Sequence, residues 1–349
     1  MRFELREQPS LTISLAAPAG ALIISFVICA AAIMWSGASP LKAYWAIFIG
    51  AMGSKLAITE TLTRATPLIF TGLAVAVAFR ARLWNIGAEG QLYAGAVVAV
   101  VLGTGALDLP GVLLVPTILI CGAVAGALFL LGPAILKLRL GVDEVVTTLL
   151  LNFIMLLFVS LLLDGPLKDP MAMGWPQSEP VVDQARLTKI IPASRLTTGM
   201  IIALLTVVAV WVMNTKTIWG YEMKAVGANP TGARFAGIPV EGAMVRVALV
   251  SGALAGLAGV VQVLGVKGDL TLDLSPGYGY SGIVVAMLAV LHPLGVVPAA
   301  IFVAGIFVGA DAMSRTVGVS SYIADVITAV SLLSMLVAIM IVRYRIRWS

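Results

Sequence analysis

Charged residues are scarce in this sequence. Only 11% of its 349 residues are Asp, Glu, Lys or Arg, whereas 60% are hydrophobic, and the mean hydropathy is +1.05. Apart from one polar loop, no hydrophilic stretch exceeds about 35 residues, which excludes a separate soluble catalytic domain. The apolar runs exceed what a soluble core of this length holds, so the sequence predicts an all-α polytopic membrane protein.

Metal ligands and disulfide partners are scarce as well. The two cysteines, Cys29 and Cys121, lie inside apolar runs, where a thiol packs as a small hydrophobe. His292 is the single histidine and forms no ligand cluster by itself. We therefore expect neither a disulfide nor a metal site.

What the sequence does contain is a series of apolar runs. Ten of them are long enough, or nearly so, to cross a hydrocarbon layer that needs about 20 helical residues. The first run follows a start in which Arg2 and Arg6 are offset by Glu4 and Glu7. It is longer than the apolar part of a secretory signal, so we expect an uncleaved first span. The ten predicted spans lie at residues 17–36, 65–79, 86–104, 112–136, 145–163, 197–213, 245–266, 279–291, 295–310 and 321–342.

Basic residues next to the runs predict the orientation in the membrane. The strongest clusters are the pair Arg80 and Arg82, the pair Lys137 and Arg139, and the C-terminal RYRIR. An even number of spans puts both termini on the same side, and all of these clusters are cytoplasmic when that side is the cytoplasm. The net charge of +5 is thus explained by orientation rather than by a nucleic-acid partner.

The longest polar interruption on the cytoplasmic side runs from residue 214 to residue 246. Within it, Asn229 suits an N-cap, Pro230 the first helical position and Gly237 a left-handed helix end, so we predict a short helix over 231–236. The loop is either a plain connector between two spans or a docking site for a soluble partner. We favour docking, because a connector needs few residues and no capping signals.

Three polar residues, Asn85, Glu89 and Gln91, occur where a basic turn leads back into the membrane. A carboxylate within a turn of an apolar span is costly unless it faces protein, water or a partner's donor. Glu89 is therefore either a functional group or a structural pin that accepts backbone amides at the start of its helix, and both interpretations stay open. Gly87 and Gly90 leave room for close backbone approach, which favours a packed turn.

Other polar and small residues indicate helix packing. We expect Gly141 to end one helix, and Asp143 and Glu144 to lie in the first turn of the next, where acidic side chains complement the helix dipole. Asn152 is expected to hydrogen-bond a neighbouring helix rather than to contact a ligand. In the seventh run, SGALAGLAG places small residues four positions apart, a pattern typical of closely packed helices.

Two further segments have alternative interpretations. Residues 37–64 are half apolar and carry Tyr44 and Trp45, so we expect an outer interfacial segment rather than one that spans the lipid. Residues 164–196 form the only long outer loop, which is rich in Pro and balanced in charge. This loop is a lid, a dock for an external protein, or a passive connector.

A family resemblance is carried by three stretches, which read TPLIFTGLAVAVAFRARLWNIGAEGQLYAGA, KLRLGVDEVVTTLLLNFI and GYEMKAVGANPTGARFAGIPV. The sequence resembles the inner-membrane permease subunits of bacterial ABC importers of the branched-chain amino acid and ribose type. It is most similar to the branch that handles nucleosides, whose members are often labelled simple-sugar permeases. The resemblance covers residues 62–341, nearly the whole chain.

The resemblance implies a set of partners. In that family the loop corresponding to 214–246 contacts a cytoplasmic ABC ATPase, and a second permease subunit, often a non-identical one in the nucleoside branch, completes the channel. An extracytoplasmic substrate-binding protein completes the importer. A single permease domain over 1–349 is thus implied, in the bacterial inner (plasma) membrane and in contact with its lipid. The residues expected to couple to the ATPase are Gly220, Glu222, Gly227, Asn229, Pro230, Arg234, Phe235 and Gly237.

The implied function is half of the translocation path for a small polar solute, a nucleoside or a related sugar compound. No Gly-x-x-x-x-Gly-Lys-(Ser or Thr) phosphate loop occurs in the chain, so ATP is expected on a partner subunit, and we expect no catalytic residue and no cofactor in this one. Two alternatives are an ion-coupled secondary transporter that uses Glu89 as its proton site, and a passive channel.

The translocation path is expected where short spans pair. The runs at 65–79 and 279–291 are short and marked by Gly or Pro, and TGLAVAVA at Thr71 aligns with SGIVVAML at Ser281 with a constant offset of 210 residues. Paired short spans of this kind are typical of a central binding path. We predict a path lined by Thr71 and Ser281. Further candidates, for the path or for a packed turn, are Asn85, Glu89, Gln91 and Asn152.

Overall fold

The structure, a computed structural model, describes residues 2–5, 11–107 and 109–347. Nearly all regular structure in these ranges is helical, which confirms the all-α class. The exception is one antiparallel pair of four-residue strands, β1 (Arg2–Leu5) and β2 (Tyr344–Arg347). The N-terminal charges of Arg6 and Glu7 lie outside the described residues.

Several described helices are long and apolar enough to span a membrane, which confirms a polytopic protein, although fewer qualify than the ten predicted spans. By length and composition, six of the described helices qualify, or up to seven if a helix pair bent by 114° counts as one span. That pair joins Ile23–Trp35 to Pro40–Met52. The six helices or helical segments are Lys55–Arg80, Gly111–Leu140, Glu144–Asp164, Gly199–Lys216, Val240–Lys267 and Pro293–Val317.

The chain divides into two compact units. Unit 1 comprises residues 1–61 and 302–349, and unit 2 comprises residues 62–301. In unit 1, α1 packs along α13, and the end of α12 packs against α2 so closely that a Cβ at Gly309 would lie 2.3 Å from the carbonyl oxygen of Ile47. The helices that contribute to unit 1 are α1 (Leu11–Trp35), α2 (Pro40–Met52), the start of α3 (Lys55–Arg80), the end of α12 (Pro293–Val317) and α13 (Ile323–Arg343).

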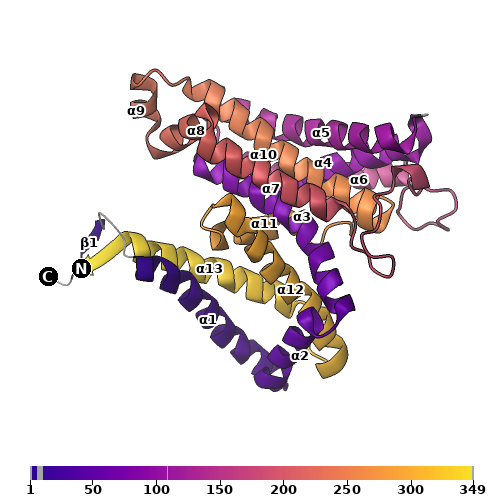
Figure 1. Cartoon of the computed structure of the whole chain (residues 1–349), viewed down its shortest axis with the longest axis horizontal. Coiled ribbons are helices and arrows are strands. Elements are labelled where there is room, and N and C mark those ends of the chain that lie inside the picture. The colour runs from indigo at the N-terminus through magenta and orange to yellow at the C-terminus, as the bar shows by residue number, and fades with distance from the viewer. Residues whose placement is uncertain (1, 6–10, 108, 348–349) are drawn as a thin grey trace. The chain divides into compact units, whose positions relative to one another are not determined.

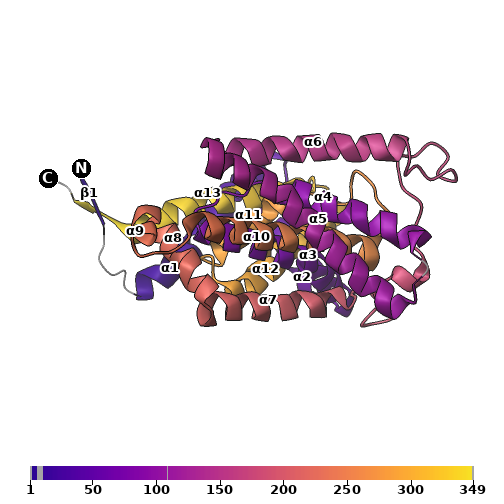
Figure 2. The ribbon, with the colours of Figure 1, turned by 90° about the horizontal axis from the view of Figure 1, so that it is seen from above.

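Unit 2 is built around three helices, α4, α5 and α10, with α6 and α7 on opposite sides of them (Figure 2). Glycines occupy the positions where α10 contacts α4 and α5. A Cβ at Gly95 would lie 2.1 Å from the carbonyl oxygen of Gly256, and a Cβ at Gly126 would lie 2.3 Å from the carbonyl oxygen of Gly252. The close packing predicted from SGALAGLAG is therefore confirmed. Besides α3 and α12, the helices of unit 2 are α4 (Ala88–Val101), α5 (Gly111–Leu140), α6 (Glu144–Asp164), α7 (Gly199–Lys216), α8 (Ile218–Ala228), α9 (Pro230–Phe235), α10 (Val240–Gln262) and α11 (Tyr278–Leu288).

Short irregular helices complete unit 2. Two π-helical turns, η1 (Leu102–Ala106) and η3 (Val263–Lys267), extend α4 and α10, and η2 (Asp183–Ala185) is a 3-10 turn in the loop 164–196.

The helix that contains the predicted span 65–79 is much longer than that span. The expectation that 65–79 is a short span is wrong, because α3 is a continuous helix of 26 residues that begins at Lys55. The preceding stretch KLAITETLTR is too polar to count as an apolar run, but it contains neither Gly nor Pro and continues the helix. The other short span is confirmed, since α11 has 11 residues. The interfacial position of 37–64, which holds α2 and the start of α3, stays a prediction.

Candidate functional site

The predicted capped helix within 214–246 is present as α9. The Asn229 side chain accepts a hydrogen bond from the Gly232 amide at 3.0 Å, and Pro230 occupies the first turn. Gly237 follows the helix with φ at +80°, the left-handed conformation that glycine adopts without strain. The capping prediction is therefore confirmed residue by residue.

A second helix in this loop, α8, was not predicted. It begins at Ile218, and the Thr217 hydroxyl caps it by accepting a hydrogen bond from the Gly220 amide at 3.3 Å. The signal for it was present, because Thr217 precedes a segment whose buried residues recur at helical spacing at Gly220, Met223 and Val226. With 11 residues in α8 and six in α9, most of the chain between α7 and α10 is helical.

Two glycines of the expected coupling set lie where α8 packs on neighbouring helix ends. A Cβ at Gly227 would lie 2.1 Å from the carbonyl oxygen of Arg80, the last residue of α3. A Cβ at Gly220 would lie 2.5 Å from the carbonyl oxygens of Met213 and Asn214 in α7. Real Cβ atoms essentially never approach that closely, so only glycine allows α8 to pack here.

The short helix α9 is the exposed part of the loop. Phe235 at its end is 96% exposed, and Arg234 beside it is exposed too. Aromatic residues and arginine are enriched where proteins bind one another, so this pair is available for a protein contact. Figure 1 shows α8 and α9 at the opposite end of unit 2 from the loop 164–196.

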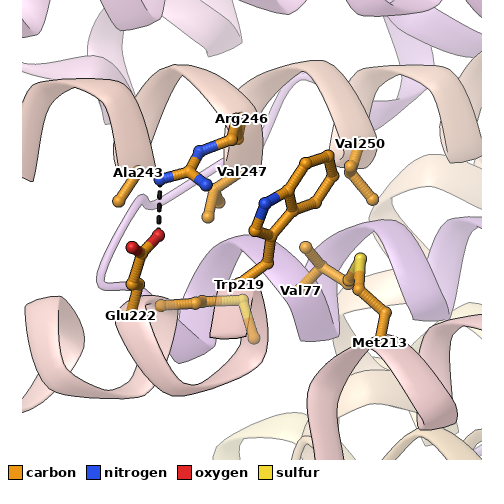
Figure 3. Close-up of a pocket in the computed structure, with 9 residues that line it drawn as sticks. Val77, Met213, Trp219, Glu222, Ala243, Arg246, Val247 and Val250 are labelled. Carbon is orange, nitrogen blue, oxygen red and sulfur yellow. Dashed lines mark hydrogen bonds and ion pairs between the residues drawn. The ribbon is translucent and has the colours of Figure 1, made fainter. Parts of the chain in front are cut away.

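A side-chain joint connects α8 to α10 (Figure 3). Nη2 of Arg246 donates to Oε2 of Glu222 at 2.5 Å, and the guanidinium carbon lies 5.3 Å from the centroid of the Trp219 ring. We call these three residues the α8–α10 joint. A small crevice beside them is lined mainly by apolar side chains, among them Val77, Met213, Val247 and Val250.

The turn between α3 and α4 holds a buried polar cluster. Nδ2 of Asn85 donates to Gln91 at 3.0 Å and to Ser251 at 3.0 Å, and Nε2 of Gln91 donates back to Oδ1 of Asn85 at 2.8 Å. The Ser251 hydroxyl donates in turn to the carbonyl oxygen of Ala74 at 2.7 Å. The cluster therefore ties α3, α4 and α10 together, and the predicted packed turn is present.

Glu89 binds a backbone amide, but on a different helix from the one expected. Its Oε2 accepts a hydrogen bond from the amide of Gly279, in the first turn of α11, at 2.6 Å. The Glu89 residue is only 3% exposed. A Cβ at Gly279 would lie 2.2 Å from the Glu89 nitrogen, so the starts of α4 and α11 lie in direct contact. This arrangement has the form of a pin between two helices.

Asn152 hydrogen-bonds neighbouring segments, as predicted. Its Oδ1 accepts from the Gly90 amide at 2.8 Å, and its Nδ2 donates to the carbonyl oxygen of Ile86 at 2.9 Å and to the Tyr280 hydroxyl at 3.1 Å. One side chain of α6 thus holds both α4 and α11.

The predicted helix boundary before α6 is also confirmed. Gly141 ends α5 with φ at +67°, and Asp143 caps α6 by accepting from the Val145 amide at 2.8 Å. Glu144, in the first turn, accepts from the Trp84 amide at 3.2 Å and pairs with Lys137. The turn between α5 and α6 is thereby fixed to the turn between α3 and α4.

Thr71 and Ser281 lie on helices that touch each other. Thr71 is fully buried, and its hydroxyl donates to the carbonyl oxygen of Tyr278 at 3.0 Å. A Cβ at Gly282, next to Ser281, would lie 2.7 Å from the Thr71 hydroxyl oxygen. The structure thus brings the two segments together, and a translocation path between them stays a prediction. Over the ranges that the structure describes, no group of three His, Cys, Asp or Glu side chains is arranged to hold a metal ion.

The long apolar helices define a multi-pass helical membrane protein. The chain belongs to the family described as branched-chain amino acid transport system / permease component, whose model matches residues 57–343. The resemblance seen in the sequence is therefore confirmed, and the protein is a permease of the ABC transporter class.

Three relatives match over nearly all of their length. The guanosine ABC transporter permease NupP of Bacillus subtilis is 38% identical over 93% of this chain and 91% of its own. The nucleoside ABC transporter permease NupB of Lactococcus lactis is 34% identical over 89% of this chain and 88% of its own. The glucose ABC transporter permease TsgB13 of Haloferax volcanii is 32% identical over 99% of this chain and 94% of its own. No solved structure matches the chain.

Proposed function

We propose that this chain is one permease subunit of an ATP-driven importer and forms half of its translocation path. The observation that carries the proposal is the capped, exposed helix α9 with Phe235 at its end, which a protein that works alone does not need. The chain belongs to a family of transport-system permeases, which supports an importer of the ABC class. ATP binds to a partner subunit, since this sequence has no phosphate loop, and the chain itself contributes no catalytic residue and no cofactor.

The cargo that we propose is a nucleoside. Two relatives with at least 34% identity are named for guanosine or nucleosides, and each is aligned over most of its length. A glucose permease is almost as similar, which keeps a sugar compound as the second candidate. Both cargoes carry a sugar ring with several hydroxyl groups, so a path with hydrogen-bonding side chains suits either one.

The proposed partners are a cytoplasmic ABC ATPase on α8 and α9, a second, non-identical permease, and an extracytoplasmic substrate-binding protein. Lactococcus lactis and Bacillus subtilis each supply two differently named nucleoside or guanosine permeases among the relatives, which supports a pair of permeases. The setting is the bacterial inner membrane, with lipid around one permease domain and with both termini in the cytoplasm. No nucleic acid takes part.

The loop 164–196 is proposed as the dock for the substrate-binding protein. Its backbone is fixed along the segment that follows α10: the Ser178 amide donates to Leu270 at 3.0 Å, the Val181 amide to Gly268 at 2.8 Å, and the Leu187 amide to Leu264 at 2.9 Å. A passive connector needs no such order. These hydrogen bonds favour a shaped surface that a protein partner recognises.

The ion-coupled alternative is not favoured. Glu89 would be its proton site, but this carboxylate already accepts the Gly279 amide, and the family of the chain consists of ABC transport permeases. A buried carboxylate that satisfies a backbone donor has a structural role without any proton transfer.

Reconstitution tests the proposed function. The permease would be co-expressed with its ATPase and second permease and placed in proteoliposomes with the substrate-binding protein. Uptake of labelled guanosine is expected to require ATP and to persist when a protonophore collapses the proton gradient. Uptake that continues without ATP and stops with the protonophore would refute the proposal in favour of the secondary transporter.

A further inference from the structure

Residues 236–239 link the exposed helix α9 directly to α10, and a second route from α9 to the body of unit 2 passes through α8, which contacts both α9 and α10. Two contacts of α8 are backbone contacts, those of Gly227 with Arg80 and of Gly220 with the end of α7. Such contacts set a distance of approach but do not resist rotation or withdrawal. The third connection, the α8–α10 joint, is a directed bond between side chains.

The joint is partly withdrawn from water. The side chain of Glu222 is 16% exposed and that of Arg246 is 29% exposed, so salt screens their attraction less than it screens a surface pair. Nε of Arg246 also donates to the carbonyl oxygen of Gly242 at 3.2 Å, which holds the arm of the side chain against its own helix. A short, charge-assisted hydrogen bond from an anchored arginine fixes both distance and direction.

Apolar packing accompanies this bond, since Met223 of α8 lines the same crevice as Ala243 and Val247 of α10, and all three are buried. Trp219 is 53% exposed, and its indole ring lies beside the crevice that Val77, Met213, Val247 and Val250 line (Figure 3). The ion pair and the guanidinium above the ring add the directed, polar part of the side-chain connection between the two helices.

On the α10 side, the joint leads directly to the buried polar cluster. Ser251 follows Arg246 by five residues, about 7.5 Å along a helix, and bonds to Asn85 and to the Ala74 carbonyl. Gly252, the next residue, packs on Gly126 of α5. A displacement of α8 that moves α10 would therefore also move the turn where α3, α4 and α10 meet.

We infer that Glu222, Arg246 and Trp219 are positioning residues that transmit movement of α9 to α10. The inference rests on the proposed function, since it requires an ATPase that moves α9. In this role the three residues contact neither the cargo nor ATP. Their function is to make each cycle of the ATPase move α10, so their loss separates ATP hydrolysis from transport.

The test is a charge swap in the complete importer. The variants are Glu222→Arg, Arg246→Glu and the two together, measured for co-purification with the ATPase, for the rate of ATP hydrolysis, and for guanosine transported per ATP hydrolysed. Each single change is expected to keep the complex assembled and to lower guanosine per ATP on the order of tenfold, as expected for loss of a charge-assisted hydrogen bond. The double variant is expected to recover most of that ratio.

Two further variants keep the test decisive. Glu222→Gln retains the shape but not the charge, and it takes the place of Glu222→Arg if that variant fails to assemble. Glu222→Gln is expected to lower guanosine transported per ATP hydrolysed by less than Glu222→Arg does. The matched control is Lys42→Glu, which reverses an exposed charge on α2, outside the loop 214–246, and is expected to leave the ratio unchanged.

Two results would count against the proposals, and each one identifies which proposal has failed. If the single and double variants lose thermal stability together while guanosine per ATP stays at the wild-type value, the joint is only structural and the inference is wrong. If the wild-type complex shows no ATP-dependent uptake at all, the proposed function has failed rather than the joint.

Discussion

The carboxylate of Glu89 accepts the amide hydrogen of Gly279 across 190 positions of sequence, at 2.6 Å. This bond joins the first turn of α4 to the first turn of α11, and it places an acidic side chain at the amino ends of both helices. Each helix presents free amides and a positive dipole end there, so one carboxylate stabilises two helix starts.

Glu89→Gln is expected to retain most transport at every pH, because the amide keeps the shape and an acceptor oxygen for the Gly279 amide. Glu89→Ala is expected to destabilise the contact, since a buried donor left unsatisfied costs about 1–3 kcal/mol. Uptake by reconstituted variants, with ATP or with a pH gradient alone, measures the first effect, and thermal unfolding of the complex measures the second. A Gln variant that assembles well but is inactive would contradict the pin.

Gly227→Ala is expected to weaken ATPase binding while the permease still inserts, because the new methyl group would meet the Arg80 carbonyl oxygen at 2.1 Å and displace α8. Gly227→Pro is expected to do the same more strongly. Co-purification with the ATPase is the measurement. Gly132→Ala is the control, since a Cβ there has no neighbour within 4 Å. Normal transport and normal ATPase binding by the Gly227→Pro variant would rule out the docking role.

Asn229→Ala is expected to cost α9 about 1 kcal/mol through loss of its N-cap, and to reduce ATPase binding in proportion. Asn229→Asp keeps a capping oxygen and serves as the matched variant. Binding of the ATPase to detergent-purified permease, titrated for each variant, compares them. Equal affinity of the Ala and Asp variants would show that the cap has no part in docking.

Trp in place of Ser281 is expected to block uptake without dissociating the complex, because the bulky ring fills the space between the closely packed α3 and α11. Trp in place of Thr71 tests the same contact from α3, where the side chain is fully buried. Uptake and subunit composition are measured on the same preparation. Normal transport by both Trp variants would show that the path lies elsewhere.

The part of the site that local chemistry determines could be predicted from the sequence. The caps of α9 follow from Asn229, Pro230 and Gly237, all within eight residues of one another. The packed turn at Asn85 and Gln91 and the packing role of Asn152 were likewise predicted, because buried amides in apolar helices need partners nearby.

Other features depend on residues far apart in sequence, which no local pattern reveals. The partner of Glu89 is Gly279, and the contact that makes glycine necessary at position 227 is the carbonyl of Arg80. The length of α3 was underestimated for a different reason. Hydropathy marks where a chain is apolar, whereas a helix ends only where capping or a breaking residue ends it.

The glycine contacts of α10 with α4 and α5 determine which parts of the protein are free to move. A methyl group at Gly95 or Gly126 has no room, so a shift of one residue along either interface would drive larger side chains into backbone. We therefore expect these three helices to move as a single rigid body, so that a displacement of α10 carries α4 and α5 with it. Structures of the transporter in different states should superpose on these three helices when each is aligned on them alone.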